Sequence, residues 1–499
     1  MIIPVYVQNI IIKLERAGFE SYAVGGCVRD LLMGKEPKDW DITTNARPDQ
    51  ILKVFPEGKY ENDFGTVLVP LKKSAEVKDD TVIEITTYRS EQGYSDRRHP
   101  DRVVFEDKLE NDLERRDFTI NAMAFRIADC RLPIADFVNF ADLVDGEQLE
   151  LVDLFGGRKD IQKKIIRAVG EPIDRFKEDA LRMMRAVRFA CQLGFSLEPK
   201  TERAIIKMAG SIKFIANERI RDEFKKILES ERAYEGVIFL HDLKLLQYII
   251  PELLTGADVK QDRHHIHTVF KHNLLSLKYC PSRDWRVRLA ALLHDIGKPK
   301  TKKIIEGVAT FYNHEYVSER MVRKIMERLK FSNEDLAKVV NLVRNHMFYY
   351  NVGEVTAASV RRLIRKVGRE NLKDLIDMRI ADRLGSGVAK AKPYKLRHLE
   401  YMMEKVQNDP VSVKMLKING TDLMQFLNID PGPKIGAILD VLLSDVIEDP
   451  ALNNRDYLEK RSQELHKLDL NELRQKAKEV IEEKREEDDT KMKEEFWVK

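Results

Sequence analysis

The pattern of apolar and polar positions changes its period near residue 150 of the chain. Before that point, short runs rich in β-branched residues alternate with amphipathic stretches. Five runs predict strands: SYAV (21–24), WDIT (40–43), TVLVPL (66–71), TVIEITTY (81–88) and RVVFE (102–106). The amphipathic opening of the chain and the segments VRDLLMG (28–34) and PDQILKVF (48–55) predict helices. We therefore expect a small mixed domain built on a sheet over residues 1–150.

From about Asp153 onward the apolar positions recur at helical spacing, and strand-like runs nearly vanish. The clearest helical segments are EDALRMMRAVRFACQLG (178–194), RLAALLHDIG (288–297), YVSERMVRKIMERL (316–329) and EDLAKVVNLVRNHM (334–347). Breaks are expected at PSRD (281–284) and at LGSGVAKAKPYK (384–395). The predicted fold class is thus α+β, and the mixed-charge segment 480–499 is expected to be a solvated, frayed helix.

The composition sets limits on this picture. A chain of 499 residues exceeds a single hydrophobic core, so several domains are expected. Its formal net charge is only +3, so affinity for nucleic acid has to come from local patches of Lys and Arg. Four cysteines without a CxxC pair argue against a disulfide framework or a zinc knuckle: Cys27, Cys130, Cys191 and Cys280. No apolar run has the length of a membrane span or the pattern of a signal peptide, so we expect a soluble cytoplasmic protein.

The densest candidate chemistry lies in YAVGGCVRDLLMGKEPKDWDIT, residues 22–43. A strand is expected to end at Gly25 and Gly26 before a helix that begins near Val28, and such a turn lets the backbone approach phosphates. Asp39 and Asp41 stand two apart on the next expected strand, so both carboxylates point to one face. They would repel each other unless hard cations such as Mg²⁺ bridge them, which suits two-metal phosphoryl transfer. The alternative is a pair of exposed turn aspartates, which the nearby glycine turn disfavours.

Together these residues resemble the signature of the class II tRNA nucleotidyltransferases and bacterial poly(A) polymerases, a branch of the DNA polymerase β-like superfamily. RRDFTINAMA (115–124), DLFGGRKDI (153–161) and EDALRMMRAVRFA (178–190) follow in that family's order and approximate spacing. The resemblance implies that Gly26 and Arg29 contact the nucleotide, that Asp39 and Asp41 hold Mg²⁺, and that Arg116 reaches the triphosphate. Glu84, in the strand VIEIT, is a candidate third carboxylate or general base, although an alternating strand often carries an exposed Glu.

The segment EDALRMMRAVRF predicts a helix on which Asp179 and Arg182 share a face, with Arg185 continuing the row. For an isolated pair, the usual interpretation is a salt bridge within the helix. The resemblance implies instead that these side chains, together with Arg188, bind the incoming nucleotide and form a Watson–Crick-like surface for its base.

Hydrogen-bond chemistry supports such a surface. A carboxylate only accepts hydrogen bonds, and a guanidinium only donates them. Cytosine and adenine each offer an exocyclic amine beside a ring-nitrogen acceptor, so both match an aspartate beside an arginine. Uracil and guanine would set acceptor against acceptor and donor against donor, at a cost on the order of several kcal/mol. The expected result is selection of CTP and ATP over UTP and GTP, which does not by itself explain a switch from C to A.

A polar loop between two expected strands, SEQGYSDRRHPDRVVF (90–105), contains Arg97, Arg98, His99 and Pro100. On its own it would be a solvated connector. In the family that the chain resembles, a flexible loop at this place is associated with addition of A, and enzymes that add only CC lack it. The loop therefore argues against a CC-adding specialist and leaves CCA-adding and A-adding enzymes both open.

Seven of the 11 histidines lie between His264 and His346. Six residues match the HD phosphohydrolase pattern H…HD…H…H…D: His272, His294, Asp295, His314, His346 and Asp382. Imidazoles and carboxylates suit a transition metal such as Mn, Fe, Ni or Co. A lone buried histidine is more often a core residue, but a spaced set around LLHDIGKP favours a metal site. An appended phosphatase or phosphodiesterase activity is a further expectation.

The segment LKINGTDLMQFLNIDPGPKIGAILDVLL (416–443) resembles the helical tail of HD-containing members of this family, which would extend along the acceptor and TΨC arms of tRNA. The expected layout is a polymerase β-like head (1–150), a base-reading neck (151–215), a body with the HD domain (216–385) and a tRNA-contacting tail (386–499). The predicted function is template-independent addition of CCA, from CTP and ATP, to the 3′ end of tRNA. The rivals are an A-adding enzyme or poly(A) polymerase, an HD phosphohydrolase whose head only binds RNA, and a non-catalytic RNA-binding module.

Overall fold

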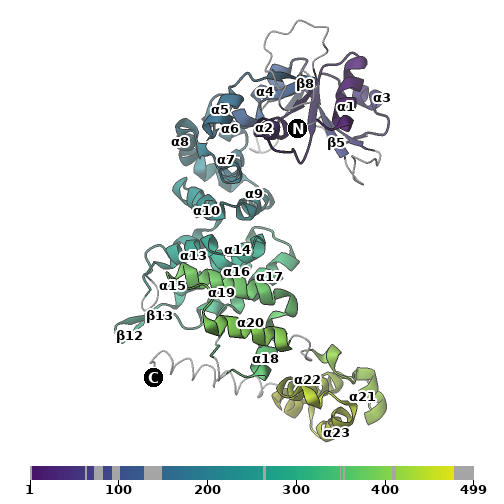
Figure 1. The fold of residues 1–499 in the computed structure, drawn as a ribbon, viewed down its shortest axis with the longest axis vertical. Coiled ribbons are helices and arrows are strands. Elements are labelled where there is room, and N and C mark those ends of the chain that lie inside the picture. The colour runs from purple at the N-terminus through teal and green to yellow at the C-terminus, as the bar shows by residue number, and fades with distance from the viewer. Residues whose placement is uncertain are drawn as a thin grey trace. The chain divides into compact units, whose positions relative to one another are not determined.

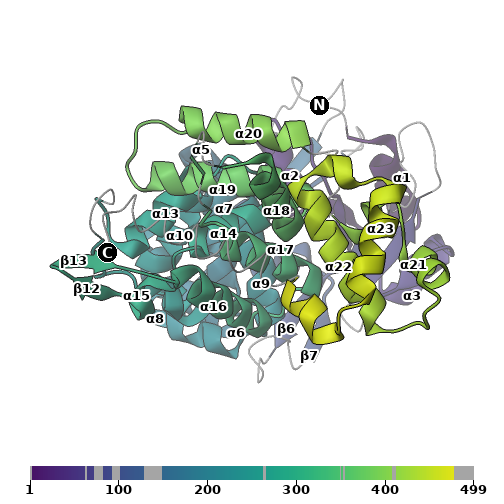
Figure 2. The same ribbon diagram turned by 90° about the horizontal axis from the view of Figure 1, so that it is seen from below.

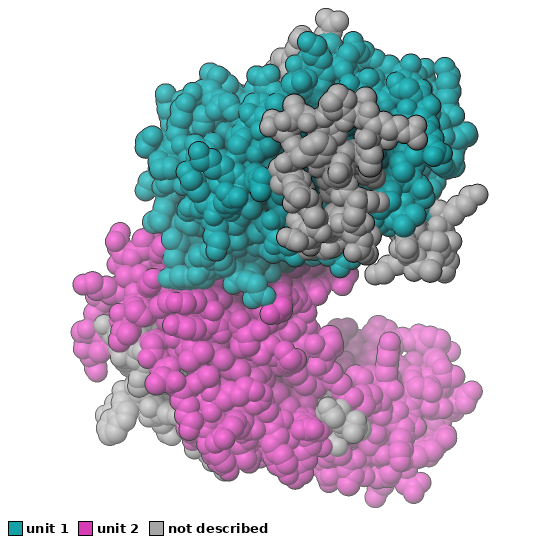
Figure 3. All heavy atoms as spheres, turned by 45° about the horizontal axis from the view of Figure 1, so that its top comes forward, with its two compact units in different colours: residues 1–251, 328–330 teal, residues 252–327, 331–499 magenta. Residues whose placement is uncertain are grey.

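The structure, a computed structural model, describes residues 3–61, 65–71, 82–92, 102–127, 149–261, 266–348, 350–351, 355–406 and 412–476. Their contacts divide the chain into two compact units, residues 1–251 with 328–330 and residues 252–327 with 331–499 (Figure 3). Within the described residues, no helix is both long enough and apolar enough to cross a lipid bilayer.

The first unit is built on a mixed seven-stranded sheet of order β3-β4-β5-β2-β1-β8-β9 (Figure 1). Its strands are β1 (Ser21–Val24), β2 (Asp41–Thr44), β3 (Lys59–Tyr60), β4 (Thr66–Pro70), β5 (Val82–Thr87), β8 (Ala124–Ile127) and β9 (Leu149–Val152). β2 and β5 run parallel, and the other neighbouring pairs are antiparallel. Four of the five predicted strands lie in this sheet. The fifth, RVVFE, forms β7 (Arg102–Phe105), which pairs with β6 (Arg89–Gln92) in a separate ribbon.

Helices α1 (Val5–Arg16) and α3 (Pro48–Val54) lie against the sheet (Figure 1). α1 buries apolar residues at i, i+3, i+4 and i+7, which is the spacing of one helical face: Val7, Ile10, Ile11 and Leu14. They share a core with strand residues such as Ile42 and Ile85. α2 (Gly26–Leu32) follows β1 directly and begins two residues earlier than the sequence predicts. The strand–glycine–helix order that positions the site is therefore confirmed.

The rest of the first unit is mainly helical. Its helices include α4 (Leu109–Glu114), α5 (Gly157–Lys163), α6 (Pro172–Glu178), α7 (Arg182–Leu193), α8 (Pro199–Met208), α9 (Asn217–Glu229) and α10 (Ala233–Asp242). The predicted helix over 178–194 is interrupted, because Asp179 is extended (φ −140°, ψ 106°) between α6 and α7. The prediction that Asp179 and Arg182 share a helical face is therefore wrong. Arg182, Arg185 and Arg188 do follow one another along α7 at helical spacing.

The second unit is a helical body, as the sequence predicts, with one short hairpin, β12 (Lys303–Ile305) and β13 (Val308–Thr310). Its main helices are α13 (Val269–Lys278), α14 (Trp285–Leu293), α16 (His314–Arg328), α17 (Asn333–Arg344), α18 (Ala357–Val367), α19 (Leu372–Gly385) and α20 (Tyr394–Val406). α14 is buried around its circumference and contacts α13, α17 and α19 (Figure 2). The predicted breaks at 281–284 and 384–395 separate α13 from α14 and α19 from α20. Toward the C-terminus, α21 (Gly420–Leu427), α22 (Pro433–Glu448) and α23 (Arg455–His466) share a core of their own.

Candidate functional site

The turn between β1 and α2 depends on Gly25. This residue has φ +85°, and an added Cβ would lie 3.0 Å from Arg116 Nη1. A side chain at this position would therefore be strained by its backbone and would displace the arginine. The Cβ of a residue at position 26 would meet only Arg29 Nη2, at 3.7 Å, which is an ordinary contact. The backbone conformation and the close contact thus require glycine at position 25 but not at position 26. The nucleotide contact of Gly26 stays a prediction.

Asp41 opens β2, whereas Asp39 lies in the bend before it, so the prediction that both stand on one strand is wrong for Asp39. The two carboxylates nevertheless line the same cavity. Desolvation raises the pKa of Asp41, the nearby charge of Asp39 raises it further, and Arg116 lowers it. Glu84 is the register partner of Asp41 across the parallel pair β2–β5. Burial, followed by the charge of Asp41, raises the pKa of Glu84. This cluster of carboxylates therefore favours a bound cation.

A cavity of about 700 Å³ gathers every residue predicted for the head and neck except Glu84. These are Gly26, Arg29, Asp39, Asp41, Arg116, Asp179, Arg182, Arg185 and Arg188. Its other lining residues are Gly25, Arg89, Arg115, Asp117, Asn121, Leu181, Phe189 and Arg219. Eight arginines face four aspartates in this cavity, so its wall favours a polyanion.

Two of the arginines are held by polar residues of the segment 112–121. Arg29 Nη1 donates to Asn121 Oδ1 at 2.7 Å. Arg116 Nη2 lies 3.0 Å from Asp112 Oδ2, and Asp112 is fully buried. Burial alone would raise the pKa of Asp112, but the charges of Arg115 and Arg116 hold it below its usual value. Asp112 is thus an ionised, buried carboxylate that holds Arg115 and Arg116, two residues of the cavity lining.

Helix α7 is joined to its surroundings by ion pairs. Arg185 Nη2 lies 2.6 Å from Asp117 Oδ2, and Arg188 Nε lies 3.2 Å from Glu223 Oε2 on α9. Burial would raise the pKa of Asp117, but Arg185 and Arg182 hold it below its usual value. Burial lowers the pKa of Arg188, against the charge of Glu223. Arg185 and Arg188 are therefore each held by a buried carboxylate.

Asp179 pairs with Arg219 of α9, with Arg219 Nη2 at 2.7 Å from Asp179 Oδ2. Arg182 pairs instead with Glu178 and donates from Nη2 to the backbone oxygen of Arg115 at 3.1 Å. A salt bridge between Asp179 and Arg182, the alternative weighed from the sequence, is therefore wrong. Both side chains do line the same cavity.

Sequence reasoning missed several residues that shape this cavity. Asp112, Asp117 and Asn121 flank the predicted Arg116, and their polar side chains in a segment with buried Phe118 and Ile120 were a usable signal. Arg219 lies 40 residues from Asp179 and offers no local signal.

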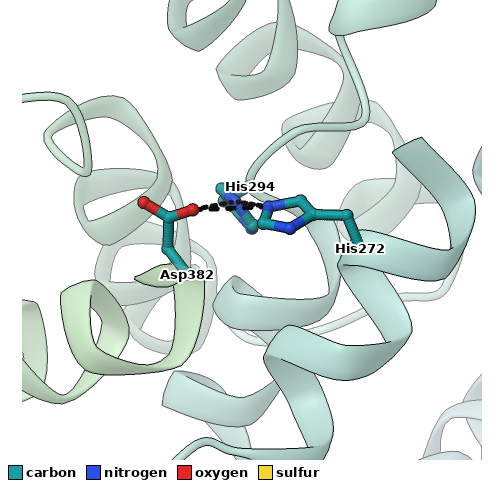
Figure 4. Close-up of side chains that lie close together, drawn as sticks. All are labelled: His272, His294 and Asp382. Atoms are coloured by element: carbon teal, nitrogen blue, oxygen red, sulfur yellow. Dashed lines mark hydrogen bonds and ion pairs between the residues drawn. The ribbon is translucent and has the colours of Figure 1, made fainter. Parts of the chain in front are cut away.

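In the second unit, the six residues of the predicted HD pattern come together. Figure 4 shows His272 and His294 facing Asp382. Their Nε2 atoms are 3.1 Å apart, and they lie 3.4 Å and 3.7 Å from Asp382 Oδ1. Asp295 bridges the rest of the cluster, with Oδ2 3.1 Å from His272 Nε2 and Oδ1 3.0 Å from His314 Nε2. His346 Nε2 lies 3.2 Å from His314 Nε2.

The orientation of these imidazoles suits metal ligation. His294, His314 and His346 each direct Nδ1 to the carbonyl oxygen three residues earlier, at 2.9, 2.9 and 2.7 Å. Such a contact fixes the ring and leaves Nε2 to face a metal. Two sets place their ligand atoms within 4.8 Å of one another: His272, His294 and Asp382, and His294, Asp295 and His346.

The charges of this cluster point the same way. Burial would lower the pKa of His294, but Asp295 and Asp382 raise it to about 10. Burial lowers the pKa of His346 to about 4, so that ring is neutral at physiological pH. The buried carboxylates thus favour a positive charge within the cluster. A proton on His294 supplies such a charge, and a transition-metal cation held by deprotonated imidazoles would supply it equally.

Three features predicted from the sequence fall outside the described residues. They are the centre of the polar loop with Arg97, Arg98, His99 and Pro100, the pair His264 and His265, and the charged segment from 480 onward.

The chain matches three known domain families in succession. Residues 21–167 match the Poly A polymerase head domain, residues 194–255 the probable RNA and SrmB- binding site of polymerase A, and residues 265–386 the HD domain.

Relatives match along nearly the whole chain. A CCA-adding enzyme of Leuconostoc mesenteroides is 31% identical over 92% of this chain and 95% of its own length. An A-adding tRNA nucleotidyltransferase of Deinococcus radiodurans is also 31% identical, over 84% of this chain and 89% of its own. Among solved structures, the Bacillus stearothermophilus CCA-adding enzyme in complex with CTP has a TM-score of 0.65 at 25% identity, covering 93% of this chain and 98% of that chain.

Proposed function

The chain belongs to the family of tRNA nucleotidyltransferases and poly(A) polymerases that carry an HD domain, and from this premise we propose that it adds CCA to the 3′ end of tRNA. It takes CTP and ATP as substrates and releases pyrophosphate at each addition. The observation that carries this proposal is the single cavity that holds a glycine turn, paired aspartates, an arginine wall and Asp179. In this proposal the aspartates bind Mg²⁺, the glycine turn and the arginines bind the triphosphate, and Asp179 helps to select the base.

Asp39, Asp41 and Glu84 supply the oxygen ligands that Mg²⁺ prefers, and their mutual repulsion fits a site for such cations. When bound, Mg²⁺ lowers the pKa of the attacking 3′-hydroxyl and stabilises the pyrophosphate leaving group, in a two-metal arrangement. Arg29 and Arg116 hold the triphosphate at the turn that Gly25 makes possible. The 3′-oxygen of tRNA then forms a bond to the α-phosphorus, and the bond to pyrophosphate breaks.

The base is selected by the protein itself. Asp179 accepts from the exocyclic amine of cytosine or adenine, and Arg182 donates to the ring nitrogen beside it. Arg182 has five N–H donors, and its contacts to Glu178, Arg175 and Arg115 use the Nη1 pair and one from Nη2. Its Nε–H and one Nη2 hydrogen are without a partner among the described residues, so the proposed contact needs no existing bond to break. Arg185 and Arg188 add positive charge beside the nucleotide.

Full CCA addition and A-only addition would use the same cavity, and one relative of each kind is 31% identical to this chain. The decisive assay supplies tRNA that ends at the discriminator base, at C or at CC, with CTP and ATP. A CCA-adding enzyme extends all three substrates to CCA. Extension of the CC substrate alone would make the protein an A-adding enzyme, and processive A addition to unrelated RNA would make it a poly(A) polymerase.

A second proposed function belongs to the HD cluster. Its four imidazoles and two carboxylates converge within hydrogen-bonding distance, and this donor set fits Mn, Fe, Ni or Co. A bound transition metal would supply Lewis acidity and an activated water for hydrolysis of a phosphate ester. Hydrolysis of 2′,3′-cyclic phosphates or simple phosphate esters by the metal-loaded protein is the test.

The residues that line the cavity weigh against a head that merely binds RNA. A non-catalytic head has no need to keep Asp39, Asp41, Arg116, Asp179 and Arg182 around one cavity. We place the enzyme in the cytoplasm, where its described cysteines would stay reduced; Cys27, Cys191 and Cys280 are free thiols. Its neck (151–215), body (216–385) and tail (386–499) would serve base reading, the HD site and tRNA contact in turn.

A further inference from the structure

Most of the hydrogen-bonding capacity of Asp179 is already used within the protein. Arg219 donates from Nη2 to Oδ2 at 2.7 Å and from Nη1 to Oδ1 at 3.3 Å. The backbone N–H of Leu181 donates to Oδ1 at 3.0 Å. A carboxylate has about four lone-pair directions, two on each oxygen. Among the described residues these bonds leave one acceptor direction, and it lies on Oδ2.

Arg219 is itself held in place. It lies in the first turn of α9, and α9 is joined to α7 by the buried pair of Glu223 with Arg188. The side chains of Arg219 and Asp179 are 27% and 14% exposed, and both line the cavity. A fork of two parallel N–H bonds defines the plane of a carboxylate, which a single backbone N–H cannot do.

We propose that Arg219 is a positioning residue that sets nucleotide preference through Asp179. By fixing the carboxylate plane and filling three-quarters of its capacity together with Leu181, it leaves a single acceptor, on Oδ2 of a side chain that lines the cavity. This inference rests on the proposed role of Asp179 in reading the base. A lone acceptor in a fixed direction rejects uracil O4 and guanine O6, whereas a rotating carboxylate admits a water that can donate to them.

Masking of Asp179 by Arg219 would have the opposite effect on activity. If the ion pair masked Asp179, a base would have to displace Arg219 before binding. Removal of Arg219 would then raise kcat/KM for CTP and ATP. Positioning predicts that removal lowers the preference for C over U and for A over G.

The test measures kcat/KM for all four nucleotides on tRNA ending at the discriminator base and at CC. Arg219→Ala removes the fork, and Arg219→Lys keeps the charge without the fork. We expect both variants to lose about ten-fold or more of the C-over-U and A-over-G preference. Arg221→Ala is the matched control, because Arg221 lies on the same helix, bonds Asp222 and the Lys330 carbonyl, and does not line the cavity. Its preferences should match the wild type.

Asp179→Ala, measured in parallel, distinguishes the positioning role of Arg219 from the base-reading role of Asp179. If it destroys preference while both Arg219 variants retain it, Arg219 is not a positioning residue and the proposed function stands. If full preference returns in Arg219→Lys, charge alone acts and the fork is refuted. A higher kcat/KM for CTP and ATP in Arg219→Ala would establish masking instead. Unchanged preference in Asp179→Ala would remove the base-reading role itself.

Discussion

At the scale of the residue, Asp39 and Asp41 carry negative charge in a cavity where arginines outnumber aspartates. We predict that Asp39→Ala or Asp41→Ala abolishes addition of both C and A, because either change removes a proposed Mg²⁺ ligand. A loss of several kcal/mol of transition-state stabilisation corresponds to roughly a thousand-fold or more in rate. Single-turnover incorporation measures the effect, and a filter-binding assay shows that tRNA still binds.

A matched control for this prediction lies on α3. Asp49 pairs with Lys53 at 3.7 Å on the surface, with 71% of its side chain exposed, and does not line the cavity. Asp49→Ala should therefore retain normal turnover. Substantial activity in either Asp39→Ala or Asp41→Ala would show that the metal site lies elsewhere.

A second prediction concerns Asp179 and Arg182. Asp179→Ala leaves no acceptor to repel uracil or guanine, so discrimination against UTP and GTP should fall. Arg182→Ala should weaken CTP and ATP alike, since both use the ring-nitrogen contact. One lost charge-assisted bond corresponds to about ten- to a hundred-fold in kcat/KM. Steady-state kinetics with all four nucleotides decides the matter, and unchanged C/A-over-U/G ratios in both variants would refute base reading by these residues.

The sequence was a good guide to residues whose role follows from local order. Arg29 follows the glycine turn on α2, and Asp39 and Asp41 lie just before and at the start of the neighbouring strand β2, so local order brings these three to one cavity. Arg116 joins them from the segment after α4 and was found through its motif. The partner of Asp179 could not be predicted, because it depends on how α9 packs beside α7. The spacing of residues within one helix does not indicate which residue of another helix they will contact.

At the scale of the element, α7 is fastened to the sheet domain by Asp117 and Arg185, 2.6 Å apart. Asp117→Asn should leave the partly buried guanidinium without its counter-ion and destabilise the protein by roughly 2–3 kcal/mol at pH 7. The pKa of Asp117 is lowered in the folded state. Its contribution is therefore complete above the unfolded pKa of about 3.9 and is lost as the pH falls below that value. Thermal unfolding from pH 7 to pH 3.5 should show the difference shrinking below about pH 4.

Asp174→Asn on α6 provides the comparison for that measurement. Asp174 pairs with Lys177 at 3.0 Å, but both side chains are more than half exposed. Such a pair contributes about 0–1 kcal/mol, so its loss should barely change the unfolding temperature. Equal effects of the two substitutions would show that the Asp117 pair does not fasten α7.

The sequence pattern predicts the strands of the sheet but not the break between α6 and α7. The strand-like runs became β1, β2, β4 and β5 of the sheet, because β-branched and aromatic side chains favour extended backbone. Of these strands, β5 alternates between buried and more exposed positions, whereas β1 is buried at every position. The break between α6 and α7 has no such signal, since EDALR contains neither glycine nor proline. Asp179 is extended there with Arg219 and the Leu181 amide as partners, and the first of these comes from another helix.

At the scale of the whole molecule, two sites lie in two compact units. Every described residue that lines the arginine-rich cavity belongs to the first unit, and all six residues of the HD cluster belong to the second. The HD cluster could be predicted from sequence although its members span more than a hundred positions, because the HD pattern specifies the residue type at each of its six points.

The last prediction follows from this division. His294 lies at the centre of the cluster, 1% exposed and 3.1 Å from His272, so His294→Ala should remove the bound transition metal. Hydrolysis of 2′,3′-cyclic phosphates or phosphate esters should be lost with it, while addition of C and A to tRNA continues at the wild-type rate. Elemental analysis of the purified protein and parallel assays of both reactions measure the outcome. His241→Ala, a change at a 40%-exposed histidine of α10, should alter neither activity nor metal content. A wild-type protein with neither metal nor hydrolase activity would reduce the HD cluster to a scaffold, and loss of nucleotide addition in His294→Ala would show that the two sites depend on each other.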